Sequence, residues 1–120
     1  MATMVKEQQK SIHSGPALMK WRRQFGISRP VYAVLSNCSE RTLATQEAKP
    51  RLVLEKERKL NESHRLIVAL GQIMEPAQVS KWLTTPNKWF EGKKPLAVIR
   101  AGRADQVWDM ILHTREGGYA

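Results

Sequence analysis

Short apolar stripes at helical spacing, each followed by a residue that ends a helix, constrain this chain most. Leu18, Trp21 and Phe25 lie at positions i, i+3 and i+7 of one such stripe, and Gly26 follows them. The alternation of apolar and polar residues that is typical of a strand is missing from the sequence. We therefore predict an all-α fold made of short helices.

Capping residues and prolines place the ends of these helices. Ser28 is a good N-cap, and Pro30 fits in the helical turn that follows, where no N–H is needed. Asn37 tolerates the left-handed backbone of a tight turn, and Ser39 is a second N-cap. Residues 51–60 are highly charged and are interpreted as a linker, with a helix as the open alternative, and Asn61 is expected to cap a longer helix. The predicted helices span residues 17–25, 28–36, 39–47, 61–74, 76–83, 95–99 and 104–114.

The charge of the chain is strongly positive and uneven. Its 120 residues include 20 Lys and Arg against 11 Asp and Glu, which gives a net charge of +9. Residues 1–60 carry a net charge of +7, whereas residues 61–120 carry +2. A basic half beside a nearly neutral half favours nucleic acid as the partner of the basic half. The alternative is a solubilising surface, with part of the charge in a loose N-terminal arm.

The cysteine, histidine and apolar content argues against several classes of protein. Cys38 is the single cysteine and cannot form an internal disulfide, which fits a reducing compartment. No apolar run approaches the roughly 18 residues of a membrane span, and the N-terminus lacks the apolar core of a secretory signal. The three histidines have no metal-ligand spacing, and no phosphate-binding loop motif is present. We therefore expect a cytoplasmic protein that is not an enzyme, holds no metal or cofactor, and binds no membrane.

The helices predicted at 28–36 and 39–47 have the size and spacing of a helix-turn-helix motif. Ala33 is small enough for the two helices to cross, Cys38 is expected to pack under the turn, and Leu43 to face inward. The segment resembles the Xre-type helix-turn-helix of bacterial and phage repressors. The matching residues are Gly26, Ser28, Ala33, Ser39, Thr42, Leu43 and Glu47.

This motif predicts which side chains face DNA. Arg41 on the second helix can pair with the edge of a guanine, and Thr45 can contact a thymine methyl group. Basic residues around the motif are candidates for phosphate contacts, which position a protein without specifying sequence. The alternative is that Arg41 is only solvated and the motif is a packing unit. The predicted DNA-binding residues are Ser28, Arg29, Ser39, Glu40, Arg41, Thr45, Lys49 and Arg51, with Lys20, Arg22 and Arg23 as further phosphate candidates.

The second half of the chain carries regularly placed turn residues. Pro86 and Asn87 predict a turn, Gly92 a backbone conformation that other residues resist, and Pro95 the start of a helix. The final helix, over residues 104–114, is amphipathic. We expect it to turn four residues inward, Val107, Trp108, Ile111 and Leu112.

Three aromatic residues lie near these turns. Trp82 is expected in the core, because a large apolar side chain in a helical stripe is normally buried. Trp89 and Phe90 lie in a polar loop, where core packing and an exposed anchor for a protein partner are both open. The aromatic residues therefore make this loop a candidate interaction site.

This stretch resembles the C-terminal domain of the Xre/MbcA/ParS antitoxin family. The matching residues are Trp82, Leu83, Pro86, Asn87, Gly92, Pro95, Leu96, Gly102 and Gly117. Together with the first motif, the resemblance covers residues 17–120. It implies a type II antitoxin whose partner is typically a RES-type toxin that breaks down NAD⁺. It also implies a homodimer within the toxin–antitoxin complex.

The resemblance further implies that the C-terminal tail covers the active site of the toxin, and that the N-terminal module binds operator DNA. A Gly-Gly pair followed by Tyr119 suits a narrow nucleotide cleft. The alternative is a frayed chain end without a role. The predicted toxin-binding residues are Trp89, Phe90, Lys93, Gly117, Gly118, Tyr119 and Ala120.

We predict three parts along the chain. Residues 1–16 form a disordered arm, residues 17–60 a helix-turn-helix module, and residues 61–120 a helical dimerisation and toxin-binding domain. Three functions remain open at this point. They are an antitoxin that binds both toxin and operator DNA, a stand-alone transcriptional regulator without a toxin, and an antitoxin whose helix-turn-helix only dimerises.

Overall fold

A computed structural model describes residues 10–117 of the chain, and within this range every regular element is a helix. The prediction of an all-α fold is confirmed. The helices in chain order are α2 (Gly15–Gln24), α3 (Arg29–Leu35), α4 (Glu40–Glu47), α5 (Leu54–Ile73), α6 (Pro76–Leu83), the 3-10 helix η1 (Lys88–Phe90), α7 (Pro95–Arg100) and α8 (Ala104–Arg115).

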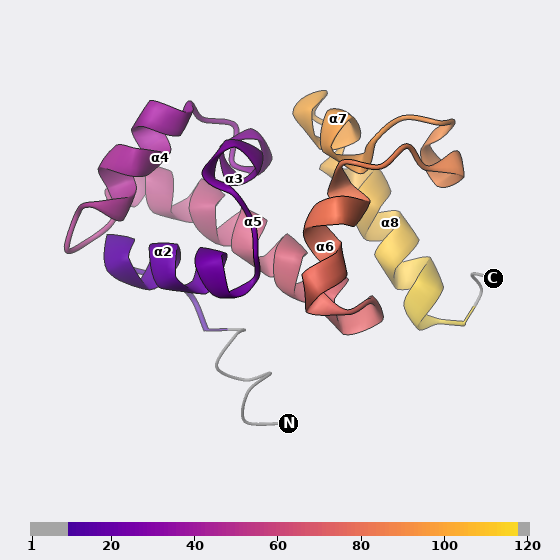
Figure 1. The fold of residues 1–120 in the computed structure, drawn as a ribbon, viewed down its shortest axis with the longest axis horizontal. Helices are drawn as coiled ribbons and strands as arrows, with labels where there is room; N and C mark the ends of the chain where they lie inside the picture. Colours follow the sequence, from indigo (N-terminus) through magenta and orange to yellow (C-terminus); the bar gives the residue numbers. More distant parts are fainter. Residues whose placement is uncertain (1–9, 118–120) are drawn as a thin grey trace.

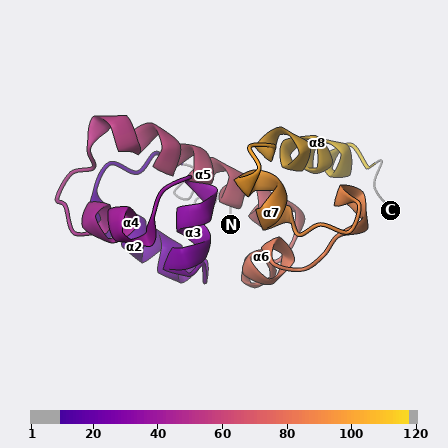
Figure 2. The same ribbon diagram turned by 90° about the horizontal axis from the view of Figure 1, so that it is seen from above.

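Helix α5 is the axis of the molecule. Figures 1 and 2 show α2, α3 and α4 grouped about its first half, and α6, α7 and α8 grouped about its second half. Helix α7 packs on α8 and also on α3, so the two groups contact each other as well as α5. We call residues 10–53 the N-terminal module and residues 69–117 the C-terminal module.

A single apolar core runs through both modules. Leu18 and Leu43 are fully buried in the N-terminal module, Ile67 is fully buried on α5, and Val107 and Ile111 are fully buried on α8. A continuous core of this kind is enough for a chain of 120 residues to fold without an internal disulfide. No helix in the described range is long and apolar enough to cross a membrane.

Local capping signals place the helix ends of the N-terminal module correctly. The Ser28 hydroxyl accepts a hydrogen bond from the Val31 N–H, and the Ser39 hydroxyl accepts one from the Thr42 N–H. Asn37 has a φ of 51°, the left-handed conformation that a tight turn requires. The predicted order of helix, turn and helix is therefore confirmed over residues 28–47.

The cap predicted at Asn61 is wrong, and the charged run over residues 51–60 is helical from Leu54 onward, which is the alternative to a linker. Helix α5 begins at Leu54 and continues without a break through Asn61. Leu, Glu, Lys and Arg are strong helix formers, so the charged run extends the helix while Leu60 turns into the core. The boundary predicted between residues 60 and 61 therefore falls inside a helix.

The disordered arm predicted over residues 1–16 is wrong for its described end, and residues 1–9 lie outside the described range. Ile12 is buried, and its backbone N–H and C=O both bond to the side-chain amide of Asn61, at 2.6 and 2.8 Å. The His13 carbonyl accepts a hydrogen bond from the Leu52 N–H. Residues 10–14 are therefore part of the fold, and α2 starts at Gly15 rather than at residue 17.

The inward face predicted for the last helix is partly wrong. Val107 and Ile111 are buried as expected, but Leu112 is 51% exposed and Met110 takes its place in the core. Trp108 is half-buried. Positions 107, 110 and 111 follow the i, i+3, i+4 spacing of one helix face, whereas position 112 lies one residue beyond that face.

Candidate functional site

Helix α4 presents a polar face to solvent. Glu40, Arg41 and Thr45 are exposed along it, while Leu43 is fully buried on the opposite side. The Thr45 hydroxyl donates to the backbone carbonyl of Arg41. An exposed guanidinium on a short helix has the geometry to reach a nucleic-acid base edge.

Two of the predicted phosphate contacts belong instead to a buried ion-pair network. Arg22 is 5% exposed, and its guanidinium binds Glu47 through two nitrogens, at 2.7 and 3.2 Å, and the Ile27 carbonyl through a third. Arg29 binds the same Glu47 carboxylate at 2.9 and 3.0 Å, although its side chain is 39% exposed. Arg22 is therefore a structural residue rather than a phosphate contact. Only the exposed part of the Arg29 side chain is accessible to a ligand.

The remaining predicted DNA-binding residues lie at the two ends of α4 and α3. Ser28 and Ser39 are exposed, but their hydroxyls already cap helices. Arg51 is exposed and Lys49 half-buried, just beyond the C-terminal end of α4. The predicted residues therefore flank α4 at both ends, with Ser39 before its first turn and Lys49 and Arg51 beyond its last.

The candidate interaction loop is built around Asn87. Its side-chain oxygen accepts a hydrogen bond from the Trp89 N–H at 2.8 Å, and its backbone pairs with Lys93 as an isolated antiparallel bridge. Glu91 and Gly92 both have positive φ, 57° and 83°, which reverses the chain within two residues. Trp89 and Phe90 precede this reversal as consecutive residues of the 3-10 helix η1, so their side chains point roughly 120° apart.

Trp89 and Phe90 therefore differ in exposure. Phe90 is 4% exposed and packs edge-on against Trp82, with ring centroids 6.2 Å apart. Trp89 is 39% exposed and contacts the imidazole of His113, with centroids 5.3 Å apart. The prediction of Phe90 as a partner-binding residue is thus contradicted by its burial in the core. Trp82, which was expected in the core, is only half-buried and packs against the core from outside.

The contact between Trp89 and His113 brings η1 to the C-terminal end of α8. Lys93 and Gly117 are exposed, and Gly117 is the last described residue, with a φ of 74°. Gly118, Tyr119 and Ala120 lie outside the described residues. The contact of His113 with Trp89 was not predicted from the sequence, and Leu112 was predicted to face inward, although it is exposed. A helical wheel aligned on Val107 and Ile111 would have indicated Leu112, but nothing local indicates His113.

The pKa values of Cys38 in the N-terminal module and Asp105 in the C-terminal module are shifted for different reasons. Burial raises the pKa of the Cys38 thiol, and Lys56 and Lys59 on α5 partly oppose this shift. On the exposed loop before α8, the Arg103 guanidinium binds the Asp105 carboxylate twice at 3.1 Å and lowers the pKa of that carboxyl. Within residues 10–117, no group of three or more His, Cys, Asp or Glu side chains is placed to hold a metal ion. The exposed polar and aromatic groups of both modules therefore suit binding.

Within residues 10–117 the chain is all-helical, with an exposed aromatic side chain in a loop beside the end of α8. Residues 69–117 match the antitoxin Xre/MbcA/ParS C-terminal toxin-binding domain, the domain that the sequence motif indicated. The exposed loop, η1, and the end of α8 all lie within the matched domain.

The fold also resembles a solved structure. A chain in the crystal structure of the M. tuberculosis MbcT–MbcA toxin–antitoxin complex superposes with a TM-score of 0.65, over 88% of this chain and 96% of that one. The two sequences are 22% identical, so the likeness shows a shared fold. No curated protein sequence matches the chain.

Proposed function

We propose that this antitoxin neutralises a RES-type toxin that breaks down NAD⁺, by binding it and covering its active site with the C-terminal tail. The observation that carries the proposal is the exposed Trp89, held against His113 where α8 ends and the tail begins. Partly exposed Trp residues are frequent anchors of protein interfaces, because they bury a large area at low entropic cost. The identity of the toxin follows from the family resemblance.

The neighbouring groups support a toxin-facing surface here. Leu112 is 51% exposed on α8, one residue before His113, so apolar area lies close to Trp89. Lys88 and Lys93 are exposed in the same loop and provide a cationic rim. An apolar centre with a charged rim is the usual anatomy of a protein interface. Gly117 and the tail would extend this surface towards the toxin.

We propose that the same chain binds operator DNA through α4 and thereby regulates its own expression. The exposed Arg41 and the excess of positive charge in the first half support this role. Homodimerisation within the complex would place two such helices on one operator. The alternative is a stand-alone regulator without a toxin, which predicts DNA binding but no protein partner.

The first experiment is to purify the tagged chain from its own host and identify what co-elutes. A stoichiometric partner that consumes NAD⁺ after separation supports the antitoxin proposal. A chain that elutes alone and binds its promoter supports the stand-alone regulator instead. A partner that has no effect on NAD⁺ would contradict the RES-type assignment.

The role of the tail needs a matched pair of deletions. Removing residues 117–120 should weaken inhibition of the toxin while DNA affinity is unchanged. Removing four residues at the other end, 2–5, is the control and should leave both unchanged. Equal inhibition by the two deletion variants would contradict a tail that covers the active site.

A further inference from the structure

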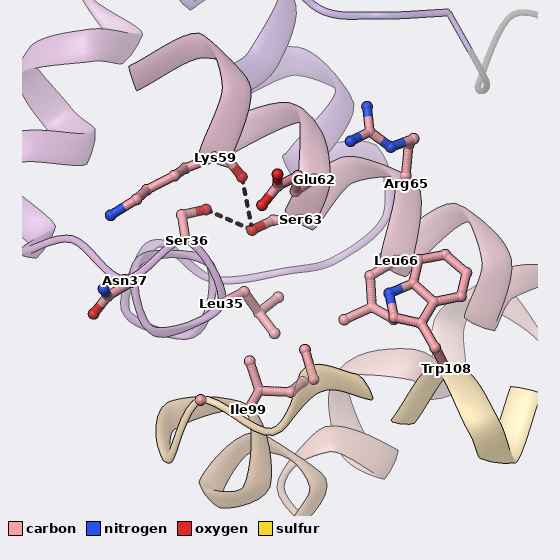
Figure 3. A pocket seen from close by; sticks show the side chains of 12 residues that line it. Leu35, Ser36, Asn37, Lys59, Glu62, Ser63, Arg65, Leu66, Ile99 and Trp108 are labelled. Carbon is pink, nitrogen blue, oxygen red and sulfur yellow. Dashed lines mark hydrogen bonds between the residues drawn. The ribbon is translucent and has the colours of Figure 1, made fainter. Parts of the chain in front are cut away.

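Helix α7 of the toxin-binding domain lies directly beside the turn between α3 and α4. Leu35 at the end of α3 faces Ile99 on α7 across the seam between the two modules (Figure 3). On one side of this contact lies a hollow of about 420 Å³. It is lined by Asn37, Cys38 and Ser39 from the turn, and by Ile99, Arg100 and Gly102 from α7 and its end. The helix that follows this turn, α4, is the one proposed to enter the DNA groove.

Arg100 is the only charged residue among those that line this hollow. It is the last residue of α7, it is exposed, and within residues 10–117 its side chain forms no ion pair or hydrogen bond. Arg103, three residues later, differs because both of its contacts go to Asp105. Arg100 therefore has a guanidinium available for an external anion, whereas Arg103 does not.

Two further cations approach the turn from α5. Lys56 and Lys59 both act on the thiol of Cys38, so their ammonium groups lie within electrostatic reach of the turn. Figure 3 shows the side chain of Lys59 extending towards Asn37. The carboxylates beside them on α5 are Glu55, which is exposed, Glu57, which pairs with His13, and Glu62, which pairs with Arg58 at 3.2 Å, while Glu40 is exposed on α4. Cations from two different elements therefore outnumber the unpaired carboxylates around the turn.

We propose that the toxin-binding domain forms part of the DNA-binding surface, with Arg100 holding a phosphate of the strand next to the N-terminal end of α4. Lys59 assists from the other side of the turn. This inference rests on the proposed DNA binding by α4. A guanidinium that is free of internal partners binds phosphate well, since it offers paired N–H donors in a fixed plane.

The placement gives α7 two different neighbours. One side of this short helix lines a hollow with Trp89 and Phe90 of the toxin-facing loop, and the other side lines the hollow with the α3–α4 turn. A toxin that contacts η1 is therefore separated from the DNA contact only by α7. The two proposed activities of the chain share a structural element, rather than lying in independent modules.

The test measures the affinity of the full chain for a 30-base-pair duplex carrying the sequence upstream of its gene, by fluorescence anisotropy, over a series of salt concentrations. Arg100→Gln should lower the affinity about five- to tenfold at about 100 mM salt, and reduce the slope of log K against log salt by about 0.9, the value for one lost phosphate contact. Arg103→Gln is the matched control, because it removes the same charge three residues away. It should leave the slope unchanged. Lys59→Gln should reduce the slope in the same direction as Arg100→Gln, and Arg100→Lys should restore most of it.

The following results would contradict the inference, and each one shows which part of it fails. If Arg100→Gln binds like the unmodified chain, or if Arg103→Gln weakens binding equally, Arg100 has no specific contact while DNA binding by α4 stands. If Arg100→Gln loses toxin binding but retains DNA affinity, the residue faces the toxin instead. If the unmodified chain shows no salt-dependent affinity, the proposed operator binding fails and the inference fails with it.

Discussion

The two modules differ in which side chains they bury. Every buried polar or charged side chain in residues 10–117 lies at or before position 64: Arg22, Ser36, Gln46, Glu47, Asn61, Ser63 and His64. The buried side chains of the C-terminal module are all apolar, and its turns have positive φ at Glu91, Gly92 and Gly102, as those of the N-terminal module do at Gly26 and Asn37. The same module also exposes Trp89 and Leu112.

This difference matches the two proposed tasks. A surface that contacts base edges needs a helix held in one orientation, and directional bonds fix orientation better than apolar packing does. A surface that captures a protein needs exposed apolar area, which turns can display beside a small core. Each of the following predictions tests this difference between the N-terminal and C-terminal modules.

The largest effect should come from breaking the buried network of the N-terminal module. Glu47→Gln leaves Arg22 buried at 5% exposure without its charge partner. Removing one partner of a buried pair typically costs about 3–5 kcal/mol. We expect a loss of this size in the free energy of unfolding, measured by urea denaturation followed by circular dichroism.

The control for this substitution is Glu62→Gln on α5. The side chains of its pair, Arg58 and Glu62, are 87% and 52% exposed, and exposed pairs contribute about 0–1 kcal/mol. A loss of less than about 1 kcal/mol for Glu47→Gln would show that the network does not stabilise the module, and the contrast between the modules would disappear.

The second-largest loss of stability is expected where the backbone of α2 approaches that of α4 in the N-terminal module. A Cβ atom added to Gly15 would lie 2.2 Å from the Gln46 carbonyl oxygen, so Gly15→Ala must push α2 away from α4. We expect a destabilisation of about 2–3 kcal/mol, since overpacking against backbone is not relieved by side-chain rotation. The C-terminal counterpart is Gly102→Ala, where the space is open and only the left-handed φ of 84° is unfavourable.

Gly102→Ala should therefore cost less, about 1–2 kcal/mol. Thermal unfolding of both variants under the same conditions provides the comparison. A larger loss for Gly102→Ala than for Gly15→Ala would reverse the order that the packing predicts.

The exposed aromatic residue should affect binding rather than stability. Trp89→Ala is expected to weaken toxin binding by about 2 kcal/mol, or roughly 30-fold, the usual size for an interface anchor. Unfolding should change by less than about 1 kcal/mol, because the side chain is 39% exposed. Isothermal titration with the separated toxin measures the first quantity.

Leu54→Ala provides the matched control for Trp89→Ala. Leu54 is an apolar residue that is 80% exposed at the start of α5, away from the C-terminal module. Its substitution should leave toxin affinity unchanged. Equal losses for the two variants would mean that general surface hydrophobicity, and not the η1 loop, captures the toxin.

Local chemistry explains which features the sequence could predict. The caps at Ser28 and Ser39 and the turn at Asn37 depend on residues within three positions, so the pattern alone was sufficient. Pairing across long separations was not visible, as the bonds of Ile12 to Asn61 and of Arg22 to Glu47 illustrate. No local rule connects residues that lie 49 or 25 positions apart.

The candidate site shows the same limit on a smaller scale. The motif correctly indicated that residues 86–95 form a turn-rich loop, but it could not separate Trp89 from Phe90. The orientation of the 3-10 helix η1 against Trp82 decides which of these two consecutive residues meets the core. The domain boundary failed for a related reason, because α5 belongs to both modules and no break in composition marks the change.

The smallest expected effect concerns the seam between the modules. Burial raises the pKa of Cys38, so at pH 8 the native chain should react more slowly with a thiol reagent than the urea-unfolded chain does. Lys56 and Lys59 oppose this shift, so Lys59→Gln should slow the native reaction further, by about twofold or less because exposed charges are screened. Lys88→Gln in the distant loop is the control and should have no effect. A faster reaction in Lys59→Gln would show that the lysine acts on the thiol by steric shielding and not through its charge.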